Sequence, residues 1–227
     1  MALAKAALLK TTLLDYPGEV ASMIFTPGCN LRCPYCHNPE LVFPNKDSSE
    51  LLPLESIRDF LKKRASLIGG VVITGGEPLI HEDLPLLINY IHSLDLKVKI
   101  DTNGLFPDQL KKVDADYIAM DLKTSPDHYY RLGLQGNKNR LVESIEYIKG
   151  SGINHEFRTT VSKTIVSPED VHKMASLLKG AEHWYLTPFK PGITLDPSFS
   201  ELQPPSSAYM EDLLTIARES GVEASIR

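Results

Sequence analysis

Residues 70–104 read GVVITGGEPLIHEDLPLLINYIHSLDLKVKIDTNG, and this stretch decides the fold. A β-rich run at 70–76 ends in a pair of glycines, an amphipathic helical pattern follows at 82–94, and a second β-rich run begins at residue 96. A strand, a turn, a helix and another strand in this order are typical of a parallel β/α unit. The stretch therefore predicts two parallel strands joined by a helix.

The same unit recurs along the chain. The β-rich runs lie at 20–26, 70–76, 96–104, 116–123, 155–161 and 183–189. Amphipathic helical patterns separate several of them, at 52–67, 82–94, 139–152 and 167–180. Ser167 followed by Pro168 is a typical helix start, and Gly180 is a typical stop. We therefore expect an α/β fold in which six parallel strands form a partial (β/α)6 barrel.

Length and composition narrow the class of protein. The 227 residues are 42% hydrophobic and 23% charged, with a net charge of −5, which is ordinary for a globular chain. We expect one domain over 1–227, with a core at about 18–190 and a C-terminal loop and helix at 191–227. The charge gives no footprint for nucleic acid, and no run is long enough to span a membrane or to form a signal peptide. These features predict a cytoplasmic protein.

Candidate site residues follow or end four of the six predicted strands and lie within a fifth. They are Cys29, then Gly75, Gly76 and Glu77, then Asp101, Thr102 and Asn103, then Asp121 and Lys123, and finally Arg158. Active sites of β/α barrels are built at the C-terminal ends of the strands, so we expect these groups to converge. Each turn taken alone is equally consistent with a plain strand ending. By contrast, His81, His92, His128 and His172 are expected at the surface.

All three cysteines lie in one short stretch, GCNLRCPYCHNP at 28–39. Cys33 and Cys36 have the spacing of a dithiol pair, and with His37 they have the spacing of a haem attachment site. The three cysteines and a histidine could hold zinc, and three thiolates alone could hold an iron–sulfur cluster with one iron left open.

The iron–sulfur interpretation accounts best for this stretch. Neither the haem site nor the dithiol pair uses Cys29, and Pro39 and Pro44 interrupt the helix that a dithiol motif needs after Cys36. Structural zinc usually takes its ligands as two separated pairs. A [4Fe–4S] cluster on Cys29, Cys33 and Cys36 uses all three cysteines and keeps one iron open for a ligand.

The other strand ends suggest what that ligand is. Lys123 and Arg158 suit a carboxylate, the carbonyl groups of the Gly75–Gly76 turn suit an amine, and acidic and amide side chains suit hydroxyl groups. We expect the N–H groups of the glycine turn to be free for a polar group. The residues therefore predict a zwitterionic ligand.

The quoted motifs resemble a known family. CNLRCPYC matches the C-x3-C-x-φ-C signature of the radical S-adenosylmethionine (SAM) superfamily, and TGGEP matches its companion motif. CHNPE, DTNG and MDLK are similar to the activating enzymes of glycyl-radical enzymes, the pyruvate formate-lyase activating enzyme group. The opening KTTLLDYPG most resembles the anaerobic ribonucleoside-triphosphate reductase activating proteins. The likeness runs from about Lys10 to Lys190.

The resemblance implies roles for individual positions. Cys29, Cys33 and Cys36 would bind a [4Fe–4S] cluster whose open iron takes SAM. The implied SAM contacts are Gly75, Gly76, Glu77, Pro78, Asp101, Thr102, Asn103, Asp121, Lys123 and Arg158. It further implies a monovalent cation beside Asp101 and Asp121. Lys190 stands where that group has a histidine, so its role and that of the segment 189–206 are open.

The resemblance also implies a reaction. An electron from a flavodoxin or ferredoxin would reduce the cluster, SAM would be cleaved to a 5′-deoxyadenosyl radical, and the radical would take a glycine Cα hydrogen from a partner enzyme. No catalytic residue is needed beyond the cluster and SAM ligands. Two alternatives stay open: a radical SAM enzyme acting on a small molecule, and a zinc-binding adaptor without catalysis.

Overall fold

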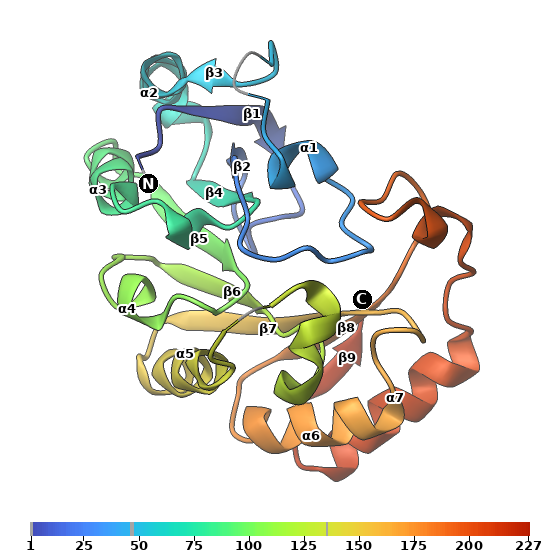
Figure 1. Cartoon of the computed structure of the whole chain (residues 1–227). Helices are drawn as coiled ribbons and strands as arrows, with labels where there is room; N and C mark the ends of the chain where they lie inside the picture. Colours follow the sequence, from blue (N-terminus) through green and yellow to red (C-terminus); the bar gives the residue numbers. More distant parts are fainter. Residues whose placement is uncertain (1, 46–47, 135) are drawn as a thin grey trace. The chain divides into compact units, whose positions relative to one another are not determined.

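The computed structural model describes residues 2–45, 48–134 and 136–227. Its backbone divides into two compact units, which we describe separately. The first unit comprises 1–30, 40–102 and 108–118, and the second comprises 31–39, 103–107 and 119–227. In both units strands alternate with helices along the chain (Figure 1). The predicted α/β class with a mostly parallel sheet is confirmed, whereas the single domain over 1–227 stays a prediction.

The first unit carries five strands in the order β3-β1-β2-β4-β5. The strands are β1 (Lys5–Thr12), β2 (Ala21–Thr26), β3 (Leu52–Pro53), β4 (Gly70–Gly75) and β5 (Lys97–Thr102). Strands β2, β4 and β5 are parallel, and β1 pairs antiparallel with β2 and β3. Its helices are α1 (Pro39–Val42), α2 (Leu54–Arg64), η1 (Ala65–Leu67), η2 (Pro78–Ile80), α3 (Leu84–His92) and α4 (Pro107–Leu110). The quoted stretch 70–104 thus forms the parallel β/α unit that its pattern predicts.

The second unit follows strand β6 (Tyr117–Asp121), which begins in the first unit. Its other strands are β7 (Asn154–Val161), β8 (Trp184–Pro188) and β9 (Ala224–Ile226), and β8 pairs parallel with both neighbours. Its helices are η3 (Pro126–Leu132), α5 (Asn139–Gly150), α6 (Pro168–Leu178), η4 (Pro197–Glu201) and α7 (Ser207–Glu219). Helices α6 and α7 pack side by side (Figure 1). No helix of the described residues has the length and apolar character to cross a membrane.

Three strands were not expected from the sequence. The run KAALLKTT forms β1 although it lacks a regular alternation, because it pairs with β2 over Ala7–Phe25, Leu8–Ile24 and Leu9–Met23. Strands β3 and β9 have only two and three residues. Strand formation at such positions depends on the neighbouring strand more than on local propensity. The C-terminal segment therefore ends in a strand after its predicted loop and helix.

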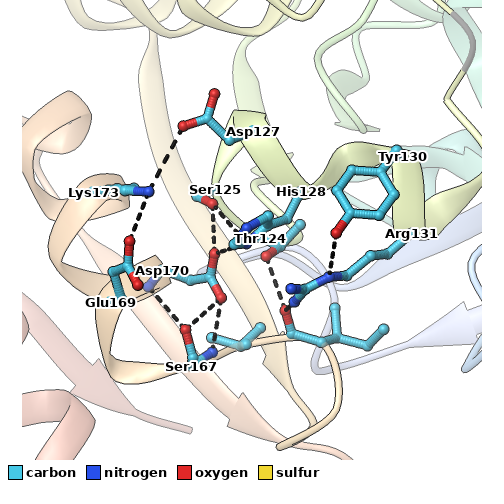
Figure 2. Close-up of polar contacts among 12 residues, drawn as sticks. Thr124, Ser125, Asp127, His128, Tyr130, Arg131, Ser167, Glu169, Asp170 and Lys173 are labelled. Atoms are coloured by element: carbon cyan, nitrogen blue, oxygen red, sulfur yellow. Dashed lines mark hydrogen bonds and ion pairs between the residues drawn. The ribbon is translucent and has the colours of Figure 1, made fainter.

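Helix α6 begins as its sequence predicts. The Ser167 side chain accepts a hydrogen bond from the N–H of Asp170, and Asp170 Oδ2 accepts from the N–H of Ser167, which completes a capping box. The other oxygen of Asp170 accepts from the Ser125 hydroxyl at 2.5 Å and lies 2.6 Å from His128 Nδ1 (Figure 2). The Ser167 hydroxyl also donates to Oδ2 of Asp170 at 2.7 Å. Asp170 is fully buried, so these four contacts to its carboxylate hold its charge in the interior.

Candidate functional site

The cysteine loop contributes residues to both units. Cys29 follows β2 in the first unit, and Cys33 and Cys36 lie in the second. Cys33 is buried and the other two are half-buried, and none of the three forms a disulfide. The N–H of Cys36 donates to the carbonyl of Cys33 at 3.0 Å, so the Cys33–Cys36 segment is a tight turn.

The proline-rich segment 189–206 packs on this turn within the second unit. The N–H groups of Leu195 and Asp196 donate to the carbonyls of Cys36 and Pro34, at 2.9 and 3.0 Å. The ring nitrogen Nε2 of His37 lies 2.9 Å from the carbonyl oxygen of Lys190. Lys190 thus contacts the loop through its backbone, while its side chain is exposed. The segment therefore positions the loop that carries two of the three cysteines.

Tyr35 is a residue that the sequence reasoning missed. It lies between Cys33 and Cys36, is buried, and packs against the rings of Phe189 and Phe199 with centroids 6.5 and 6.4 Å apart. Among the described residues its hydroxyl meets no hydrogen-bond partner. Burial, and next the charge of Cys33, raise the pKa of Tyr35 well above its usual value. An aromatic residue between two closely spaced cysteines is the signal that could have identified it.

The turn Gly75–Gly76 packs against the chain that leads into Cys29, within the first unit. Gly75 has a φ of 117°, which favours glycine, and a Cβ on Gly76 would lie 1.9 Å from the carbonyl oxygen of Gly28. The N–H groups of Gly76 and Glu77 donate to the carbonyls of Thr26 and Gly28 at 2.9 and 2.8 Å. These two N–H groups are thus used inside the protein, contrary to the expectation that they are free.

Glu77 connects the ends of two parallel strands. Its carboxylate is 1% exposed, and Oε1 accepts from the hydroxyl of Thr102 at 2.7 Å and from the N–H of Leu79 at 3.1 Å. The second contact begins helix η2, whose first residue, Pro78, is also buried. In the first unit the structure thus brings together Glu77, Pro78 and Thr102 from the predicted set.

Asn103 and Gly104 turn the chain after β5, in the second unit. Asn103 is buried and its Oδ1 accepts from the N–H of Leu105 at 3.1 Å. Gly104 has a φ of 77°, and a Cβ there would lie 2.0 Å from the methyl carbon of Met120. The DTNG motif therefore has a structural requirement for glycine in addition to any role at a ligand.

Asp121, Lys123 and Arg158 form one charged group in the second unit. The guanidinium Nε of Arg158 lies 2.8 Å from Asp121 Oδ1, and the ammonium of Lys123 lies 3.3 Å from Oδ2. Burial by itself would raise the pKa of Asp121, but the charges of Arg158 and Lys123 outweigh it and lower the pKa to about 2. Burial would likewise lower the pKa of Lys123, and Asp121 raises it well above its usual value. All three groups are therefore charged at neutral pH.

This charged group lies close to the cysteine turn of the same unit. Cys33 and Tyr35 act electrostatically on Lys123, and Lys123 acts on Tyr35. The hydroxyl of Tyr129 accepts the N–H of Lys123 at 3.0 Å and fixes the backbone there. The structure thus brings Asp121, Lys123 and Arg158 together, as predicted, and places them near one of the three cysteines.

Two placements differ from the expectations. His81 was expected at the surface, but it is 1% exposed and its Nε2 lies 3.0 Å from the carbonyl oxygen of Pro27. Asp121 and Lys123 both lie in the run 116–123 that was expected to form one strand, but β6 ends at Asp121. The ammonium of Lys123 nevertheless contacts the Asp121 carboxylate, from the loop that follows β6. The buried ring of His81 thus contacts the backbone of Pro27, two residues before Cys29.

The donor set fits an iron–sulfur cluster. Among the described residues no group of three or more His, Cys, Asp or Glu is arranged to hold a single metal ion. A cluster offers a separate iron to each thiolate, so its three cysteines need not converge on one point. Three cysteines within one loop, stabilised by the 189–206 segment and by the glycine turn, are the residues such a cluster requires.

Comparison with known proteins shows the family. The radical SAM superfamily matches residues 23–178, which is more than half of the sequence, and the chain therefore belongs to this superfamily. Members bind a [4Fe–4S] cluster and SAM, which confirms the two predicted cofactors. The expected fold of the radical SAM type is confirmed as well.

Two relatives and one solved structure show which members of the superfamily the chain resembles. The chain is 29% identical over 224 residues to a protein of Methanocaldococcus jannaschii named "Putative glycyl-radical enzyme activating enzyme", covering 94% of this chain and 91% of the relative. It is 25% identical to the pyruvate formate-lyase-activating enzyme of Clostridium pasteurianum, over 74% of this chain and 72% of that one. The structure of a radical SAM methyltransferase from Sphaerobacter thermophilus covers 96% of this chain and 68% of its own, with a TM-score of 0.72 and 19% identity.

Proposed function

We propose that this chain is the activating enzyme of a glycyl-radical enzyme, and that the partner is an anaerobic ribonucleoside-triphosphate reductase. The observation that carries the activase assignment is the likeness to the M. jannaschii protein, which extends over nearly the full length of both chains. The choice of reductase rests on the resemblance of the opening KTTLLDYPG. A flavodoxin or ferredoxin would donate the electron, and the reaction would take place in the cytoplasm, where thiols stay reduced.

In this proposal Cys29, Cys33 and Cys36 hold the cluster. When bound and reduced, the cluster would supply the electron for cleavage of SAM to methionine and a 5′-deoxyadenosyl radical, which would take the glycine Cα hydrogen. The protein contributes orientation and exclusion of competing reactions. The hydrogen bonds from 195–196 to the cysteine turn, and the packing of Phe199 on Tyr35, keep the loop in one conformation.

The predicted SAM contacts divide by chemistry. Gly75, Gly76 and Glu77 would meet the amine, and Pro78, which begins η2, follows directly after them. Thr102 and Asn103 would lie along SAM, and Asp101 would belong to the same site. In the second unit Asp121 and Glu156 face Lys123, Arg158 and Arg227. Lys123 and Arg158 are the cations of this group that would suit the carboxylate of SAM.

A glycyl radical on the partner is the direct test. The chain, reconstituted anaerobically with iron and sulfide, would be reduced and mixed with SAM and a purified anaerobic ribonucleotide reductase, and the glycyl radical measured by electron paramagnetic resonance. We expect a radical signal that is absent when the radical-bearing glycine of the reductase is changed to alanine. Pyruvate formate-lyase in place of the reductase tests partner choice.

The alternatives give different outcomes in the same assay. If 5′-deoxyadenosine forms but neither partner gains a radical, the chain acts on another substrate, and a small molecule becomes the better proposal. If the reconstituted chain holds zinc in place of iron and sulfide and forms no product, the non-catalytic zinc adaptor is favoured. Either outcome would overturn the activase assignment.

A further inference from the structure

The middle of strand β5 contains a buried lysine. Lys99 is 1% exposed, although lysine is almost never fully buried unless it is paired. Its ammonium lies 2.6 Å from Oδ1 of Asp101, two residues further along the same strand. It also lies 5.9 Å from the ring centroid of Tyr117, within the range of a cation–π contact. The pair is built into the sheet of the first unit.

An apolar cluster lies beside Lys99. Residues 99 and 101 point to the same face because side chains alternate along a strand, and Val72 of β4 is the register partner of Lys99. Val72 belongs to a buried cluster with Tyr16 and Met23, against which Tyr117 packs. An ammonium in such a layer is costly unless a carboxylate compensates it. Asp101 supplies this compensation.

The resemblance implies a monovalent cation beside Asp101. The residues around Oδ1 of Asp101 fit such a cation poorly. The Lys99 ammonium already lies 2.6 Å from Oδ1 of Asp101, so this oxygen has a cationic partner within the chain. A second positive charge on the same oxygen would lie within a few ångström of the first, where repulsion in a buried site is strong. Oδ1 of Asp101 thus has a cation that belongs to the chain itself.

We propose that the ammonium of Lys99 replaces a bound Na⁺ or K⁺ at Asp101, so that SAM binding by this chain needs no monovalent cation. In this proposal Lys99 is a positioning residue: its ammonium neutralises the Asp101 carboxylate and holds it in one orientation from the same face of β5. The inference rests on the proposed place of Asp101 in the SAM site. It adds that this site is complete without an added ion.

The test compares the chain in KCl or NaCl with the chain in choline chloride, whose cation is too large to enter a monovalent-ion site. The reconstituted wild type should bind SAM with Kd values within about 2-fold in all three salts. In Lys99→Met, which keeps the volume and removes the charge, SAM binding should be at least about 10-fold weaker in choline and should recover in K⁺ or Na⁺. Lys97→Met is the matched control, because Lys97 is 58% exposed and pairs with Glu19.

Thermal unfolding of the cluster-free chain gives a second reading that does not depend on SAM. K⁺ or Na⁺ should raise the unfolding temperature of Lys99→Met saturably relative to choline, as expected for a ligand that binds the folded state, and should leave the wild type unchanged. A saturable rise in the unfolding temperature of the wild type with K⁺ or Na⁺ would overturn the proposal. This measurement on the wild type tests the proposal even if Lys99→Met fails to fold. Equal behaviour of Lys99→Met in all salts would overturn it too. If SAM binds to neither protein, the proposed function fails while the thermal comparison still decides the role of Lys99.

Discussion

The hydroxyl of Thr102 donates a 2.7 Å hydrogen bond to Oε1 of Glu77, and this bond joins the ends of two neighbouring parallel strands. Both residues belong to motifs that the sequence marks as functional, the Gly-Gly-Glu-Pro turn and the Asp-Thr-Asn-Gly turn. The bond is buried, so the carboxylate has little access to water if a partner is lost. One side chain thereby fixes the relative position of two candidate ligand-binding turns.

Thr102→Val should therefore destabilise the chain. The substitution keeps the shape of the side chain and removes a donor from a buried carboxylate, which typically costs about 1–3 kcal/mol of unfolding free energy. Urea unfolding followed by circular dichroism measures this. Thr215→Val, at an exposed position of α7, is the matched control and should change stability by less than about 0.5 kcal/mol. Equal effects of the two substitutions would show that the bond to Glu77 contributes nothing.

Gly76→Ala should disturb the segment before Cys29. The new methyl group would lie 1.9 Å from the carbonyl oxygen of Gly28, and backbone has to move to relieve that contact. We expect a loss of at least about 1 kcal/mol in stability, and less iron retained after reconstitution. Gly150→Ala, where nothing lies within 4 Å, is the control and should leave both quantities unchanged or slightly raise stability. Wild-type iron content in Gly76→Ala would contradict the supporting role of this turn.

The Asp121–Arg158 pair predicts a pH dependence. The folded-state pKa of Asp121, about 2, is below its usual value, so its stabilising contribution is present above pH 4 and is lost as the pH falls from 4 to 2. Because Asp121 is about a third exposed, solvent screening limits this contribution to about 1 kcal/mol. Arg158→Gln should reduce stability at pH 5 and flatten the loss between pH 4 and pH 2.

Denaturant titrations at pH 5 and pH 2.5 measure this difference. Arg218→Gln is the control, since Arg218 donates to the backbone carbonyl of Ala224. It should keep the wild-type pH dependence. An unchanged pH dependence in Arg158→Gln would mean that the arginine does not hold the carboxylate in its charged form.

We expect Asp170 and Asp127, two carboxylates of the second unit, to contribute differently to the free energy of unfolding. Asp170→Ala removes a buried acceptor that serves Ser125, Ser167 and His128, and should cost about 3 kcal/mol. Asp127 is half-exposed and pairs with Lys173 (Figure 2), so Asp127→Ala should cost at most about 1 kcal/mol. Chemical unfolding of both variants measures the contrast. Similar losses would show that the buried network adds no stability.

Much of the fold follows from local patterns. The six predicted strands and the helices after residues 53, 83, 138 and 167 all form, because periodicity, helix capping and glycine turns act over short distances. Strands β1, β3 and β9 could not be predicted in this way, since they are short or irregular and exist through pairing with a neighbour.

The site was predictable in its residue types but not in its contacts. The motifs identify Glu77, Thr102 and Asp121, whereas the partners of these residues come from tertiary structure. Lys99 lies two positions before a predicted motif and looks like a solvated lysine in a strand. Its burial depends on the neighbouring apolar cluster, which is assembled from β2, β4 and Tyr16 of the preceding loop and is packed by Tyr117 of β6.

The central claim is that the three cysteines hold a cluster at which SAM is cleaved. Its most direct test is anaerobic reconstitution with iron and sulfide, reduction in the presence of SAM, and measurement of 5′-deoxyadenosine, for the wild type and for Cys29→Ala, Cys33→Ala and Cys36→Ala. The account predicts product from the wild type and at least about 100-fold less from each folded variant. A variant that lacks one cluster ligand would not hold the intact cluster, and without the cluster no electron is supplied for the cleavage of SAM. Product at the wild-type level from any of the three variants would contradict it.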